Sequence, residues 1–288
     1  MSTYKRILVP TDFSVQAEKA LEVAVDIARR TQAEITLLHV VDVPMPAGTD
    51  PNALYHTVDL SVNPFFKENS TEYINRKVEV FRKTYEDVTL HTHVVFDVTQ
   101  KHIAEYISEN PADIIVMGTS GVNGIDELLV GSNTEKVIRL SGTPVLSIKD
   151  HQDEFEPKTM VFASDFKKIS YQSVEKLKAF QALYNTKILF TKIITPNSFE
   201  TTIKTENTIE DFVKEHSFEN YEIHHFNFFS EEEGIRVFAE DKNADLIAMT
   251  THGRTGISHI LMGSVAEEVA NHSKLAVLTF NQHFDKKD

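Results

Sequence analysis

The stretch that decides the fold is residues 112–148, which read ADIIVMGTSGVNGIDELLVGSNTEKVIRLSGTPVLSI. An unbroken apolar run over residues 114–117 is followed by a polar loop that begins at Gly118, and Gly131 opens a helical pattern. Residues 144–148 read as a second buried strand. Because these apolar runs lack the alternation of a strand with one wet face, the pattern predicts a strand, loop, helix and strand in a parallel sheet covered on both faces.

The loop after the first strand carries three glycines, each with a role that backbone chemistry predicts. Gly118 lets the chain turn off the strand, and Gly121 allows a ligand to approach closely. Gly131 and Ser132 begin a helix whose free N–H groups and dipole favour a phosphate. The structural alternative is that Ser132 is an ordinary N-cap. Since the loop leaves the carboxyl end of a parallel strand, it lies where open α/β sheets bind ligands.

A second copy of this stretch strengthens the phosphate hypothesis. Residues 244–280 read ADLIAMTTHGRTGISHILMGSVAEEVANHSKLAVLTF. Gly253, Gly263 and Ser264 repeat the spacing of the first loop, and Thr250 stands where the first copy has its strand-exit glycine. The chain is therefore predicted to be a tandem repeat in which only the first loop is complete.

The motif and its flanks resemble the nucleotide-binding loop of the universal stress protein family. Residues 7–14, ILVPTDFS, also resemble the first strand of that family and the acidic residue that ends it, here Asp12. The resemblance covers both halves of the chain. It implies two doubly wound α/β domains of the adenine nucleotide alpha hydrolase-like type, each with a five-stranded parallel sheet of order 3-2-1-4-5, whose final strands pair with each other.

The resemblance further implies ATP as the ligand, with or without Mg²⁺. Asp12 would contact the ribose or adenine, and the backbone at Val40 would meet the adenine. Asp12 could also cap the helix that follows it, and the two roles are compatible; the ligand contact is favoured because the glycine loop converges on the same edge of the sheet. The full candidate set is Asp12, Val40, Gly118, Gly121, Gly131 and Ser132 in the first half, with a weaker second site at Asp165, Gly253, Gly263 and Ser264.

The repeat divides the chain into a first domain over residues 1–149, a polar linker over 150–157 and a second domain over 158–288. Domains of about 150 residues are common, and each half has enough apolar residues for a core. The second half is shorter between its second and fourth strands, and a β-branched Thr250 resists the positive φ of a glycine and occupies the approach of a ligand. We expect weak phosphate binding or no ligand there, so that the half is mainly structural or regulatory.

Composition excludes several classes of protein. The chain has 288 residues, a formal net charge of −14 and no cysteine, so disulfides and thiolate metal sites are absent and nucleic acid is not an expected partner. The N-terminus MSTYKR leads straight into a strand, and no apolar run approaches the roughly 20 residues that a membrane helix needs. The sequence predicts a cytoplasmic protein with no membrane partner.

The histidines do not form a metal site in the sequence pattern. His91 and His93 alternate to one face of a predicted strand but have no third ligand, and the adjacent His224 and His225 point to opposite faces. His252 in the second loop could contact a phosphate or act as an acid or base. Without a carboxylate partner in the pattern, we expect His252 to be simply exposed.

Three functions remain open at this point. The leading one is a stress-response protein that binds ATP as a ligand in the first domain. The alternatives are a nucleotide-free scaffold or protein-interaction module, and a slow ATPase. The chain has no Walker lysine after the glycine loop, no evident general base and no metal–carboxylate cluster, so we expect no catalytic residues. The protein partners, the signal and any further homodimer are left open.

Overall fold

The computed structural model describes residues 4–42, 64–97, 106–107, 109–119, 137–138, 141–149, 154–167, 169–251 and 260–281. The described elements of the first half are β1 Arg6–Pro10, α1 Val15–Thr31, β2 Glu34–Asp42, α3 Pro64–Thr84, β3 Leu90–Asp97, β4 Ile114–Thr119 and β5 Val145–Lys149. Those of the second half are β6 Thr159–Ala163, α6 Tyr171–Tyr184, β7 Lys187–Ile194, η1 Pro196–Ser198, α7 Thr202–Glu215, β8 Tyr221–Asn227, α8 Glu231–Asp241, β9 Leu246–Thr251, α9 Ile260–His272 and β10 Ala276–Asn281.

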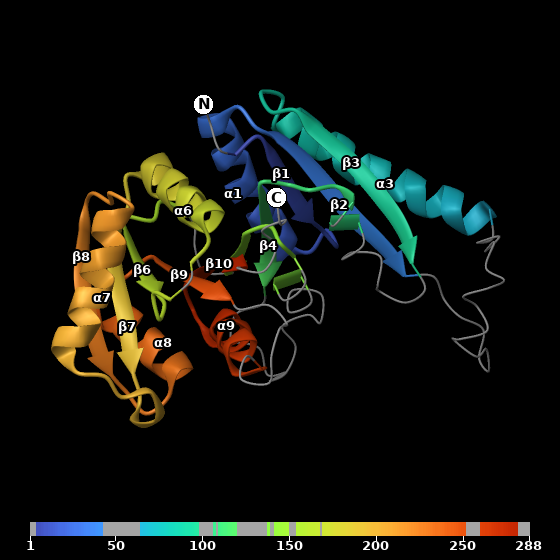
Figure 1. Ribbon diagram of the computed structural model, residues 1–288. Helices are drawn as coiled ribbons and strands as arrows, with labels where there is room; N and C mark the ends of the chain where they lie inside the picture. Colours follow the sequence, from blue (N-terminus) through green and yellow to red (C-terminus); the bar gives the residue numbers. More distant parts are fainter. Residues whose placement is uncertain are drawn as a thin grey trace, which may run out of the picture.

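The strands form one ten-stranded sheet of order β3-β2-β1-β4-β5-β10-β9-β6-β7-β8. Strands pair in parallel within each half, which confirms the predicted order 3-2-1-4-5 for the first half and gives the same order in the second. The two halves lie side by side (Figure 1). They join through an antiparallel pair in which Leu278 of β10 is opposite Leu146 of β5. The predicted pairing of the two terminal strands is therefore confirmed.

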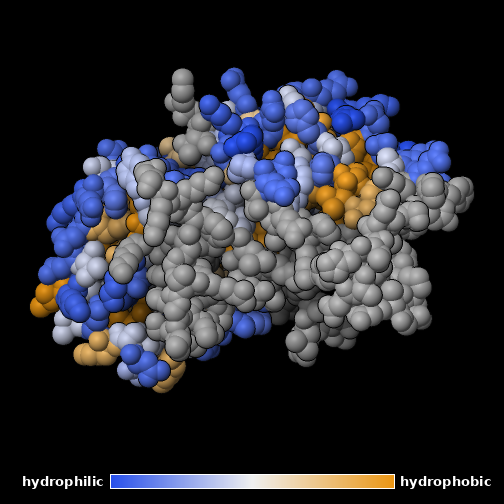
Figure 2. Space-filling view, turned by 45° about the vertical axis from the view of Figure 1, so that its right-hand side comes forward, coloured by the Kyte–Doolittle hydropathy of each residue, from blue (hydrophilic) through white to orange (hydrophobic). Residues whose placement is uncertain are grey.

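Both faces of the sheet are covered, as the unbroken apolar runs predict. One face packs against α1, α3, α6 and α7, and the other packs against α8 and α9. Every residue of β5 is buried, including Ser147 and Lys149. Figure 2 shows hydrophilic residues over much of the described surface on one side of the molecule. Apolar strands thus form the interior, and polar helix faces meet the solvent.

Helices α1 and α6 meet across the junction of the two halves. The Tyr184 hydroxyl donates to Asp26 at 2.9 Å, and Arg30 forms ion pairs with Asp26 at 2.9 Å and Glu156 at 2.7 Å. Arg30 also lies over the Tyr184 ring, 4.7 Å from its centroid. Burial and the nearby Asp26 carboxylate raise the pKa of Tyr184, so its hydroxyl remains a proton donor to that carboxylate. These contacts supplement the strand pairing that holds the halves together.

Candidate functional site

In the first half, Asp12 and Val40 lie at the same edge of the sheet. Asp12 follows β1, Val40 is near the end of β2, and the Thr11 N–H donates to the Leu38 carbonyl at 2.9 Å between these two strands. The Asp12 side chain is exposed, and its Oδ1 accepts the N–H of Ser14 at 2.9 Å. Val40 is half-buried. The structure therefore brings an exposed carboxylate and the predicted adenine position together at the carboxyl ends of neighbouring strands.

His39 has a role that the sequence pattern does not reveal. Its Nδ1 lies 2.6 Å from the Thr11 carbonyl oxygen, and its ring lies 4.8 Å from the ring of Phe13. Phe13 has a positive φ of 62°, an uncommon conformation for a residue other than glycine. His39 thus contacts Thr11 and Phe13, the residues directly before and after Asp12. These contacts stabilise the turn that presents the Asp12 carboxylate. In the sequence it reads only as one histidine in a strand.

Gly118 lies inside β4, opposite Ile148 of β5, so it does not turn the chain off the strand as predicted. A Cβ at this position would overlap the backbone carbonyl of Gln16 and lie 2.9 Å from the nitrogen of Ala17, in the first turn of α1. The glycine is required because this helix packs directly onto the strand. The predicted role of Gly118 in ending the strand was therefore wrong, since β4 continues through Thr119.

Several predicted residues cannot be placed with these. Gly121, Gly131, Ser132, Gly253 and His252 lie outside the described residues. Gly263 and Ser264 belong to α9, which begins at Ile260, so they lie within the helix and do not open it. The predicted helix start at Gly263 was therefore wrong, because α9 already includes Ile260. The apolar sequence from Ile260 to Met262 extends the helical pattern ahead of the glycine.

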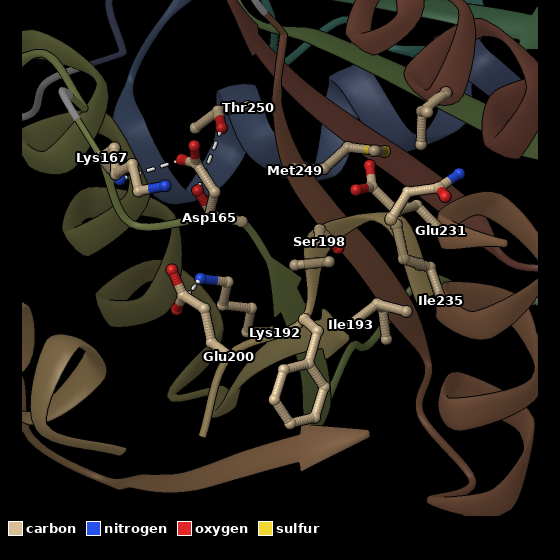
Figure 3. Close-up of a pocket in the computed structure, with 15 residues that line it drawn as sticks. Asp165, Lys167, Lys192, Ile193, Ser198, Glu200, Glu231, Ile235, Met249 and Thr250 are labelled. Atoms are coloured by element: carbon tan, nitrogen blue, oxygen red, sulfur yellow. Dashed lines mark hydrogen bonds and ion pairs between the residues drawn. The ribbon is translucent and has the colours of Figure 1, made fainter. Parts of the chain in front are cut away.

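The second half contains a cavity of about 280 Å³ at the corresponding edge of its sheet (Figure 3). Its apolar wall includes Ile193 of β7, Ile235 of α8 and Met249 of β9. The segment that follows η1 and the turn after β6 supply polar side chains. The cavity occupies the carboxyl ends of the strands, which is the usual position of ligands in such sheets.

A local difference between the halves explains why there is space here. Ser14, the N-cap of α1, follows closely after Asp12 in the chain. Ser170, the N-cap of α6, comes about one helical turn further along the chain from the equivalent Asp165. The helical turn that presses on Gly118 therefore has no counterpart beside Thr250. Thr250 lies in β9 opposite Phe280, lines the cavity, and has its Oγ1 3.3 Å from Ser164 Oγ. Its side chain does project into the site, as predicted, but the position needs no positive φ because it is part of a strand.

The charges around the cavity are unevenly compensated. Lys192, which corresponds to His39, is 5% exposed, and its Nζ lies 2.6 Å from Glu200. That hydrogen bond is the main cause that lowers the pKa of Glu200, and Lys204 at 3.2 Å adds to it. In contrast, burial and then the nearby Asp165 carboxylate raise the pKa of Glu231, and the charge of Lys192 opposes this shift only in part. The lysine therefore has a partner, while two carboxylates face the remaining space.

The described parts of the chain contain no group of three or more histidine, aspartate and glutamate residues that could hold a metal ion. His91 lies 3.3 Å from Glu34, and the His93 ring stacks on Tyr106 at 4.4 Å. Over the same parts, no helix has the length and apolar character that a membrane crossing requires. The histidine pairs singled out in the sequence thus have ordinary side-chain partners.

The doubled fold defines a tandem α/β protein with one doubly wound unit per half. The universal stress protein family model matches residues 3–149 and 157–281, so the chain belongs to this family as a tandem two-domain member. Universal stress protein MJ0577 of Methanocaldococcus jannaschii is 36% identical over 154 residues, which are 51% of this chain and 95% of that protein. MJ0531 of the same organism is 32% identical over 151 residues, 52% of this chain and 85% of that protein.

Among solved structures, a universal stress protein from Archaeoglobus fulgidus aligns over 96% of this chain and 98% of its own, with a TM-score of 0.76 and 18% identity. At this identity the likeness shows the fold alone. The curated relatives match about half of the chain, whereas this structure matches both halves together. The protein is thus a stress-response protein of this family with two fused units.

Proposed function

We propose that the protein binds ATP as a ligand through its first domain, in the cytoplasm, and that its second domain has mainly a structural or regulatory role. The observation that carries this proposal is the arrangement of Asp12, Val40 and Gly118. Asp12 follows β1, Val40 lies on β2 and Gly118 lies on β4, and the strand order reverses between β1 and β4. In doubly wound sheets, the crevice at this reversal is the general ligand position.

The exposed groups fit the polar parts of a nucleotide. Asp12 presents a carboxylate, which accepts hydrogen bonds from hydroxyl groups such as those of a ribose. The glycine loop predicted from the sequence supplies backbone N–H groups for the phosphates. When bound, ATP supplies three phosphates, and these are the groups that bind Mg²⁺. The metal would therefore enter together with the nucleotide. No catalytic residue is assigned, and the nucleotide acts as a signal that the protein holds.

The first experiment asks whether the purified chain retains a nucleotide. The protein would be denatured and its supernatant measured by absorbance and mass spectrometry. ATP in the supernatant supports the proposal, whereas protein that neither retains nor binds added ATP is the nucleotide-free scaffold. A phosphate-release assay with the same preparation distinguishes the slow ATPase from a protein that only binds ATP.

Titration calorimetry with a matched pair of variants locates the site. Asp12→Ala should weaken ATP binding by about ten-fold, the cost of losing a hydrogen bond to a charged group. Asp165→Ala changes the equivalent residue of the second domain and should leave the affinity unchanged. The reverse result would place the nucleotide in the second domain.

A further inference from the structure

The cavity of the second domain has features that disfavour a nucleoside triphosphate. Its volume is about 280 Å³, and ligand cavities usually span about 300 to 1,000 Å³, so it has room for a small molecule only. Among the described residues of its wall, Lys192 is a buried cation, and Glu200 already pairs with it. A triphosphate would also meet the negative charges of Asp165 and Glu231, which both line the space.

Asp165 and Glu231 reach the cavity from different elements. Asp165 lies in the turn after β6, where its Oδ1 accepts the N–H of Lys167 at 2.9 Å. Glu231 is the first residue of α8, and its pKa is raised by burial and by Asp165. Like charges in one partly buried space repel each other, so a cation between them would stabilise both. Lys167 is exposed, and Lys192 forms an ion pair with Glu200 while its charge partly offsets the effect of Asp165 on Glu231.

Part of the wall is apolar, and Ser164, Asn197, Ser198 and Thr250 add neutral polar groups to it. Ile193, Ile235 and Met249 lie around the same space as Glu231 (Figure 3). Phe199 lines it as well and is 77% exposed, so its ring lies at the solvent side of the cavity. Pockets of this kind, apolar with a few converging polar groups, are typical of small-molecule sites.

We propose that this cavity binds a small organic cation, with its ammonium group between Asp165 and Glu231 and its apolar part against Ile193, Ile235 and Met249. This site is independent of ATP binding by the first domain. It assigns the second domain a ligand of opposite charge to the nucleotide, so the two halves of the repeat would respond to different molecules.

The test uses the full-length protein and tyramine, which joins an aromatic ring to a primary ammonium group. Its matched probe is 4-ethylphenol, which has the same ring and chain without the amine. In ligand-observed NMR titrations, tyramine should bind at least about ten-fold more tightly than 4-ethylphenol, as the loss of a hydrogen bond to a charged group predicts. Equal affinities, or no tyramine binding at millimolar concentration, would overturn the proposal.

Matched variants place the ammonium group. Glu231→Gln and Asp165→Asn keep the shape of each side chain, and the asparagine oxygen can still accept the Lys167 N–H. Each should weaken tyramine binding by about ten-fold. Glu233→Gln makes the same charge change at an exposed position of α8 that does not line the cavity, and should have no effect. If Glu231→Gln and Glu233→Gln have the same effect on tyramine binding, the proposed position of the ammonium group is wrong. ATP titrations of the same variants report separately on the first domain.

Discussion

The Nζ of Lys149, the last residue of β5, donates to the carbonyl oxygen of Ala270 in α9 at 2.5 Å. Lys149 is 1% exposed, so a buried ammonium from the first domain meets the last turn of a helix in the second. Cations are favourable there because the final carbonyls of a helix lack partners within it. Lys149 also lies opposite Thr119 of the neighbouring strand β4. Thr119 is the last described residue before the rest of the first glycine loop.

Lys149→Met should therefore destabilise the whole chain. Methionine fills a similar volume but leaves the Ala270 carbonyl without this donor, at an expected cost of about 1 to 3 kcal/mol. Chemical denaturation would measure the free energy of unfolding. The control is Lys214→Met, which removes an exposed ion pair with Glu210 and should have little effect on stability. Equal effects of the two substitutions would show that the buried contact has no special weight.

Gly118→Ala should be more damaging than a single added methyl group suggests. The new Cβ would overlap the Gln16 carbonyl, and the helix would have to move away from β4 at a cost of about 1 to 3 kcal/mol. Thr250→Ala, at the matching position of β9, removes atoms beside an open cavity and should cost less. A thermal melt of both variants checks the order. Unchanged stability in Gly118→Ala would contradict the close helix–strand contact.

Much of the fold could be predicted because its signals are local and repeated. The apolar runs predict buried parallel strands, and the strand order and the pairing of the terminal strands followed from the family resemblance. The role of Gly118 could not be predicted, because the atoms that exclude a side chain belong to Gln16, which is far away in the sequence. The second-domain cavity depends on the late start of α6, whose only sequence signal is the longer spacing from Asp165 to Ser170.

Glu231 provides a prediction with a pH dependence. Its folded-state pKa is raised by burial, so the native protein binds this proton more readily than the unfolded chain, and the ionised form costs stability above the unfolded pKa. Glu231→Gln should raise the melting temperature at neutral pH, and this gain should disappear as the pH falls and Glu231 becomes protonated. Glu233→Gln should show no such trend. An increase in melting temperature from Glu231→Gln that becomes larger toward low pH would contradict this prediction.

The first domain alone should not remain a soluble monomer. In a chain of residues 1–150, β5 would expose the edge that pairs with β10, including Val145, Leu146 and Ser147. Open apolar strand edges associate with other edges, so this fragment should dimerise or aggregate. Sedimentation velocity at several concentrations would show it. A monomer at all concentrations would mean that the strand pairing is dispensable.

The most direct measurement of the central claim is the stoichiometry of ATP binding to the full-length chain. Equilibrium titration should give one nucleotide per chain, because the first domain has the complete glycine loop and the second has Thr250 and two facing carboxylates. Gly131→Val should abolish that binding by blocking approach to the helix amides, and Gly263→Val should leave it intact. Two nucleotides per chain, with one of them lost in Gly263→Val, would contradict the division of roles between the domains.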